Sequence, residues 1–172
     1  WLNHYMAVMT RLIIEYGGIV DDYAGDGIKA NFGVPLSTRD DSDRRHAQRA
    51  LHCALAMLAK LRELNADHAA RGLPTVGMRI GIHSGEVVGG TIGDSRRMKF
   101  TTIGKAVNQA ARLESTEAVA FDGKARILIS ADTKRLLDDH FRSLYRGRIS
   151  LKGLEEPVDI YEVALEQESC AL

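Results

Sequence analysis

A long amphipathic stretch in the first third of the chain constrains the fold more than any other feature. Between residues 44 and 61, small and aliphatic side chains recur at helical spacing and form one apolar stripe: Ala47, Leu51, Ala54, Leu55, Leu58 and Leu61. Residues 40–43 are of types that cap helix N-termini, and Gly72 with Pro74 ends the pattern. The spacing predicts one long helix with a single apolar face, which needs a second layer to pack against.

Short extended runs lie on both sides of this helix. Two of them meet at Asp26-Gly27, a dipeptide typical of hairpin turns, and a second strand pair is predicted around Ser84-Gly85. The predicted strands cover residues 19–24, 28–32, 76–83, 86–92, 98–103, 126–129, 143–151 and 158–163, and further helices cover the residues before Gly17-Gly18, 107–113 and 132–137. Strand pairs interrupted by crossover helices predict an α+β fold, with helices packed on a mostly antiparallel sheet.

The composition excludes several classes of function. Lys plus Arg equals Asp plus Glu, at 23 each, so neither a nucleic-acid-binding surface nor a basic membrane patch is indicated. No apolar run approaches the roughly 18 residues of a spanning helix, and no signal peptide opens the chain. The two cysteines, Cys53 and Cys170, form no disulfide framework or metal motif, and Cys53 falls on the predicted helix as a core residue. We therefore expect no nucleic acid partner, no membrane contact from this segment and a reducing, cytoplasmic location.

Four residues could carry chemistry, although each also has a purely structural interpretation. Asp26 suits a hairpin turn, but a carboxylate at a hairpin tip can also hold Mg²⁺. Asn108 and Arg112 share one face of a predicted helix, either as solvated residues or as an amide and a guanidinium that meet a reacting phosphate. Lys152 is either a surface lysine at a turn or a point charge for a triphosphate. No P-loop, zinc motif or nucleophile elbow is present.

Four segments, in order, give these residues a common context. They are GIVDDYAGDGIKANFG at 18–33, MRIGIHSGEVVGG at 78–90, FTTIGKAVNQAARLE at 100–114 and LKG at 151–153. The four segments resemble the metal-binding hairpin, the central strand pair, the signature strand with its catalytic helix, and the closing motif of class III adenylate and guanylate cyclases. The resemblance spans nearly the whole chain and implies a single catalytic domain over residues 1–172 with a ferredoxin-like βαββαβ core.

The resemblance implies a role for each candidate residue. Asp26 would hold metal, Asn108 would position the ribose, Arg112 would stabilise the transition state, and Lys152 would bind the triphosphate of the substrate. Family enzymes use two Mg²⁺ (or Mn²⁺) ions per site and act as head-to-tail dimers with sites at the interface, so a homodimer with two equivalent sites is implied. The family's first metal carboxylate lies on an opening strand that residues 1–172 do not contain, so we expect the domain to be N-terminally incomplete.

Substrate choice depends on the two positions that the resemblance places at the purine, Asp22 and Thr101. Adenylate cyclases typically have Lys at the first position, whereas Asp22 is an acceptor suited to the N1–H and amino group of guanine. Thr101 can donate or accept and decides nothing. The sequence therefore favours conversion of GTP to cyclic GMP and pyrophosphate. The alternatives are an adenylate cyclase and a non-catalytic cyclase-like domain that dimerises or senses nucleotide.

Overall fold

The computed structural model describes residues 1–34, 43–94, 96–153 and 156–165. Its elements, in chain order, are α1 (Leu2–Glu15), β1 (Gly18–Ala24), β2 (Gly27–Phe32), α2 (Asp43–Ala70), β3 (Met78–Ile82), β4 (Val88–Asp94), β5 (Arg97–Ile103), α3 (Lys105–Ser115), β6 (Ala125–Ser130), α4 (Ala131–Leu136), β7 (Ser143–Ile149) and β8 (Val158–Val163). The mixture of helices with largely antiparallel strands confirms the predicted α+β class.

The main sheet has the strand order β3-β6-β8-β7. Its strand β6 is almost fully buried, and successive residues face opposite layers because side chains alternate along a strand. Ile127 and Ile129 pack with the apolar stripe of α2, as the sequence predicted, whereas Leu128 packs with Leu113 of α3. Helices α2 and α3 therefore cover opposite faces of the sheet, and burial against the sheet fixes the position of α3.

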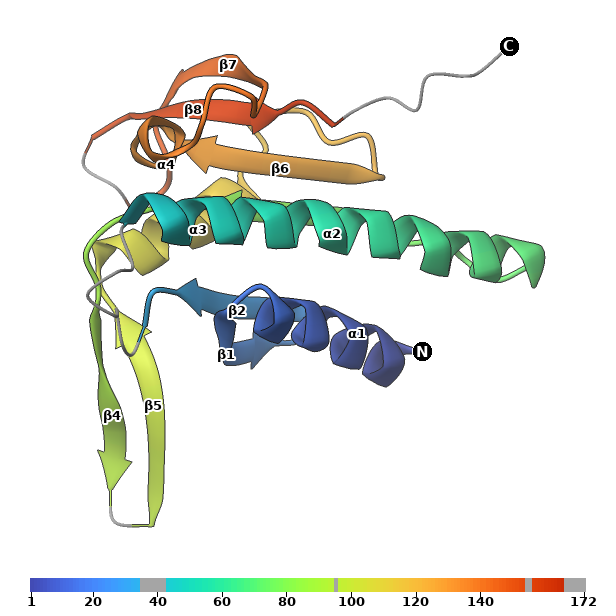
Figure 1. Ribbon diagram of the computed structural model, residues 1–172, viewed down its shortest axis with the longest axis horizontal. Coiled ribbons are helices and arrows are strands. Elements are labelled where there is room, and N and C mark those ends of the chain that lie inside the picture. The colour runs from blue at the N-terminus through green and yellow to red at the C-terminus, as the bar shows by residue number, and fades with distance from the viewer. Residues whose placement is uncertain (35–42, 95, 154–155, 166–172) are drawn as a thin grey trace.

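Two hairpins stand beside this body. Strands β1 and β2 pair with each other next to α1, and β4 and β5 form an arm that projects away from the other elements (Figure 1). The turn between β1 and β2 consists of Gly25 and Asp26, not of Asp26 and Gly27 as predicted. Gly25 has φ 65° and Asp26 has a negative φ, so the positive φ that this tight turn needs is supplied by the preceding glycine.

The second predicted strand pair is wrong. Strand β3 pairs in parallel with β6, and β4 pairs with β5, which follows it directly in the chain. The physical reason is burial: Met78 of β3 belongs to the α2 core, whereas β4 is exposed along most of its length. Gly81 of β3 lies so close to α3 that a Cβ there would come within 2.4 Å of the Ala110 carbonyl oxygen. Helix α3 therefore packs closely on one face of β3, while β4 pairs with β5 outside the main sheet.

Within the described ranges, no helix combines the length and the apolar character needed to cross a membrane.

Candidate functional site

A bulge in strand β1 determines how the first hairpin presents its carboxylates. Val20 is opposite Ala30 and Asp22 is opposite Lys29, so Asp21 is an extra residue in the β1 strand. In such a bulge two neighbouring residues oppose a single partner residue. The result is that Asp21 turns inward and is buried, while Asp22 is exposed.

Asp22 forms an ion pair with the arm. Lys99 of β5 places its Nζ 2.7 Å from Asp22 Oδ1, which also accepts a hydrogen bond from the backbone N–H of Tyr23 at 2.9 Å. The hydrogen bond from Lys99 lowers the pKa of the Asp22 carboxyl below its usual range, so this carboxylate is ionised at neutral pH. Among the described residues, no group donates a hydrogen bond to Asp22 Oδ2, so this oxygen can accept one from a ligand.

Sequence reasoning found Asp22 but missed Lys99. A signal for it exists, because Lys99 and Thr101 are two residues apart on β5 and side chains alternate along a strand. Thr101 is half-buried, and the ammonium of Lys29 lies 3.5 Å from its Oγ1. The structure thus gathers Asp22 and Thr101, the two predicted purine contacts, around two lysines that the sequence did not single out.

Helix α3 carries the predicted catalytic pair on its exposed face. Ala106 and Leu113 face the protein interior, and Asn108 and Arg112, four residues apart, are exposed. Because one face of α3 is buried on the sheet, the opposite face is held in a fixed orientation. Within the part of the chain that the structure describes, neither Asn108 nor Arg112 has a side-chain partner, so both are available to a ligand.

Lys152 is exposed in the turn after β7, next to the buried Leu151. Like Arg112, its side chain has no partner among the described residues. Leu151 anchors this turn in the smaller core cluster together with Leu113 of α3. The predicted triphosphate lysine and the predicted catalytic helix are therefore attached to the same packed unit.

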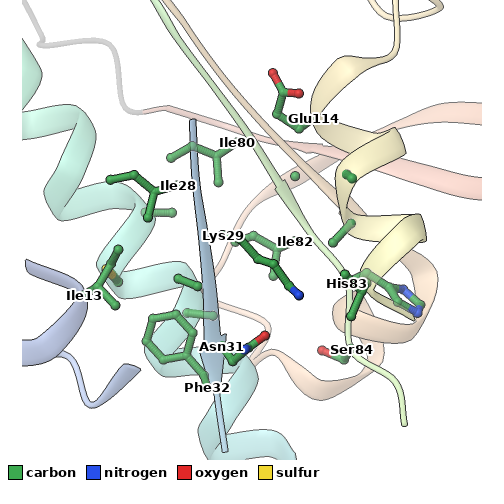
Figure 2. A pocket seen from close by; sticks show the side chains of 18 of the residues that line it. Ile13, Ile28, Lys29, Asn31, Phe32, Ile80, Ile82, His83, Ser84 and Glu114 are labelled. Atoms are coloured by element: carbon green, nitrogen blue, oxygen red, sulfur yellow. The ribbon is translucent and has the colours of Figure 1, made fainter. Parts of the chain in front are cut away.

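A cleft of about 1180 Å³ separates the first hairpin from the main body of the chain. Asp22 and Asp26 of the hairpin line it, and so do apolar residues of α2 and β3 (Figure 2). Asn108, Arg112 and Lys152 do not line this cleft. Asp26 thus faces the cleft, whereas the α3 pair does not.

Asp26 is the one predicted metal ligand, and it is exposed at the tip of the hairpin. An exposed carboxylate oxygen is of the type that Mg²⁺ and Mn²⁺ bind, so Asp26 fits the role. The described ranges contain no group of three or more His, Cys, Asp or Glu residues placed to hold a metal ion.

Comparisons with known proteins agree with this geometry. The model of the adenylate and guanylate cyclase catalytic domain matches residues 1–164. The chain is 32% identical to adenylate cyclase 1 of Rhizobium meliloti (strain 1021) over 162 residues, which is 94% of this chain and 23% of that protein. The chain therefore spans less than a quarter of that relative's length.

Two solved structures share the fold over 99% of this chain. The adenylyl cyclase CyaB from P. aeruginosa has a TM-score of 0.86 at 33% identity, with 83% of that chain covered. The guanylyl cyclase Cya2 has a TM-score of 0.80 at 36% identity, with 82% covered. The chain belongs to the class III family of adenylate and guanylate cyclase catalytic domains.

Proposed function

We propose that this chain forms half of each active site of a guanylate cyclase, which converts GTP to 3′,5′-cyclic GMP and pyrophosphate. The observation that carries the proposal is the Asp22 carboxylate, ionised beside Lys99 with Oδ2 open to a ligand. Guanine presents two donors, N1–H and the amino group, to such an acceptor, whereas adenine presents the N1 lone pair. A site built around these hydrogen bonds can discriminate between purines by roughly 10⁴-fold.

The reaction needs positioning and charge stabilisation more than a protein nucleophile. The ribose 3′-oxygen forms a bond to the α-phosphorus, the bond from the α-phosphorus to the pyrophosphate oxygen breaks, and the hydroxyl proton passes to water. In the proposed site Asn108 orients the ribose, Arg112 faces the charge that develops on the α-phosphate, and Lys152 binds the triphosphate. Two Mg²⁺ or Mn²⁺ ions, when bound, lower the pKa of the 3′-hydroxyl and neutralise the leaving pyrophosphate. Asp26 would supply one of their carboxylate ligands.

A head-to-tail homodimer is part of the proposal. Asp26 lines the cleft and the α3 pair does not, and in a head-to-tail dimer Asp26 of one copy would meet the α3 pair of the other at one substrate. The β4–β5 arm also supports association, because Val88, Ile92 and Met98 are exposed on it. Exposed apolar surface of this kind favours burial against a partner.

The cleft between the first hairpin and the main sheet has the features of a binding place for an additional strand. Within the described residues β2 pairs only with β1, and β3 pairs only with β6, so each strand has one edge without a partner. Residues of both strands line the cleft, including Ile28, Ile80 and Ile82 (Figure 2). Unpaired strand edges beside apolar side chains are suited to an added strand. We propose that an upstream strand fills the cleft and brings the second metal carboxylate close to Asp26.

Turnover of GTP and ATP by the full-length protein tests the substrate assignment. We expect kcat/KM to be much higher for GTP, and we expect Asp22→Lys to reduce GTP turnover sharply. Asp159→Lys, on the distant strand β8, is a matched control that should leave the nucleotide preference unchanged. Equal or better use of ATP by the wild-type protein would overturn the guanylate assignment and leave the cyclase assignment in place.

Complementation tests the shared site. Asp26→Ala and Arg112→Ala homodimers should each be nearly inactive. When the two proteins are mixed, half of the dimers are heterodimers with one intact site of two, so about a quarter of wild-type activity should return. Heterodimers that form without recovering activity would contradict a site shared between subunits.

An adenylate cyclase is the second candidate, and one observation favours it. Lys99 brings an ammonium to the position beside Asp22, and an ammonium can donate to adenine N1. Lys99→Met separates the two candidates, because loss of the donor would harm ATP turnover more than GTP turnover in an adenylate cyclase. A non-catalytic domain, the remaining alternative, would show no turnover of either nucleotide in the full-length protein.

A further inference from the structure

A buried ion pair behind the proposed purine contacts has no counterpart among the candidate residues found from the sequence. Asp21 is buried, and its Oδ2 lies 2.8 Å from Lys29 Nζ. The same oxygen accepts hydrogen bonds from Thr102 N at 3.0 Å, from Thr102 Oγ1 at 2.7 Å and from Asn31 Nδ2 at 2.9 Å. Four donors on one carboxylate oxygen join β1 and β2 to β5.

Lys29 of β2 also binds strand β5 directly. Its Nζ donates to the Thr102 carbonyl oxygen at 2.7 Å and lies 3.5 Å from Thr101 Oγ1. Asp21 and Lys29 therefore bind Thr102 at its amide, its hydroxyl and its carbonyl oxygen, and Lys29 also approaches the hydroxyl of Thr101. Lys29 points into the cleft on the side of β2 opposite Phe32 (Figure 2).

The pair lies between the two proposed purine contacts. Asp22 follows Asp21 directly and is opposite Lys29 in the hairpin, while Thr101 belongs to the strand that the pair binds. Asp22 and Thr101 come from different hairpins, so their separation depends on what joins those hairpins. Among the described residues, the polar contacts between β1–β2 and β5 all involve this cluster, apart from the exposed pair of Asp22 with Lys99.

We propose that Asp21 and Lys29 are positioning residues for nucleotide selectivity, which hold Asp22 and Thr101 at the separation that one purine base requires. The inference rests on the proposed function, because it takes Asp22 and Thr101 to be the purine contacts. It assigns no contact with substrate to Asp21 or to Lys29, since the three donors of Lys29 are used by Asp21, Thr101 and Thr102. Burial raises the pKa of Asp21, but the hydrogen bonds from Lys29, Thr101 and Thr102 together lower it below its usual range, so the pair is charged at neutral pH.

The test compares variants of the full-length protein by the ratio of kcat/KM for GTP to kcat/KM for ATP. Lys29→Met keeps the length of the side chain and removes the donors, and it leaves Asp21 buried without its cation. The double variant Asp21→Asn/Lys29→Met removes both charges and keeps the protein foldable if Lys29→Met alone unfolds. We expect each variant to reduce the preference for one nucleotide, measured as the ratio of the two kcat/KM values, by about tenfold. Small misplacements of binding groups have effects of this order or larger.

Arg146→Met is the matched control. Arg146 forms a 2.6 Å ion pair with Glu162 across β7 and β8, away from both hairpins, so its loss should leave the ratio unchanged. A merely structural role for Asp21 and Lys29 would lower the melting temperature and reduce turnover of both nucleotides equally. That outcome in the folded double variant would overturn the inference.

Failure of the inference can be distinguished from failure of the proposed function. A wild-type protein that prefers ATP contradicts the guanylate assignment, but the variants should still bring its ratio closer to one. A wild-type protein that prefers GTP, with variants that keep the same ratio, contradicts only the positioning role. A wild-type ratio near one counts against both, because there is then no selectivity to position.

Discussion

The main sheet and the β4–β5 arm are both built from strands, yet they differ in where their apolar side chains go. In β6, Ile127, Leu128 and Ile129 are 0% exposed between two helical layers. On the arm, Ile92 is 51% exposed and Met98 is 69% exposed. An isolated two-stranded hairpin is at best marginally stable in water, whereas a sheet covered on both faces buries its own core. The main sheet therefore stabilises the protomer, and we propose that the arm contributes through association with a second copy.

The residues of the proposed site also divide between the packed main body and the exposed arm. Asn108 and Arg112 are carried on a helix that packs on the main sheet, so their placement depends on the core. Thr101 and Lys99 are on strand β5 of the arm and are tied to the first hairpin through polar contacts. The placement of the proposed catalytic residues is thus set by apolar burial, and that of the proposed purine contacts by ion pairs and hydrogen bonds.

The largest expected effect is in the core. Ile129→Ala should lower the free energy of unfolding by about 2–5 kcal/mol, because it leaves a cavity between α2 and the sheet. Ile92→Ala on the arm removes the same atoms from a position that is exposed in the protomer, so it should change the free energy of unfolding of the monomer by less than about 0.5 kcal/mol. Urea denaturation of both variants measures the difference. Similar losses in the two would contradict the division between core and arm.

A charge on the arm should affect association more than protomer stability. Met98→Asp should weaken dimerisation at least tenfold, a change of about 1.4 kcal/mol, and reduce cyclase activity in parallel. Sedimentation at several protein concentrations measures this, and Leu73→Asp, another exposed apolar position, is the control. A Met98→Asp protein that stays dimeric and active would show that the arm is outside the interface.

The stabilisation that Asp21 provides between the arm and the first hairpin should be lost at acid pH. The pKa of Asp21 is lower in the folded protein than in the unfolded chain, where it is about 3.9, so its ionised form favours folding. Its contribution is complete above about pH 5 and is lost as the pH falls through the unfolded value toward the lower, folded value. Asp21→Asn should therefore destabilise the protein more at pH 7 than at pH 3, as measured by urea unfolding at each pH. An equal loss at both would contradict the charged pair.

The smallest effect concerns Cys53 on α2. Burial raises the pKa of its thiol to about 11, so very little thiolate exists at pH 8. Iodoacetamide should leave Cys53 unmodified in the native protein and alkylate it in urea, as peptide mapping by mass spectrometry would show. Rapid alkylation under native conditions would indicate that the α2 core opens readily.

The sequence by itself determined the local elements and the family. The apolar stripe of α2, the hairpin around Asp26 and the helix carrying Asn108 and Arg112 were all predictable, because each depends on residues close together in the chain. The order of the four motifs was enough to identify the family, which the match over residues 1–164 confirms.

Only the tertiary structure decided which strands pair and which carboxylate is buried. The parallel pairing of β3 with β6 depends on the burial of both between α2 and α3, which no local pattern reveals. Asp21 and Asp22 are chemically identical neighbours, and the bulge in β1 sends one inward and leaves the other exposed. The partner of Asp21, Thr102, lies 81 residues further along the chain, so its contact exists only after the hairpin and the arm have been brought together. The physical reason is that a strand pattern specifies alternation, whereas the identity of the opposing side chain is set by packing between distant segments.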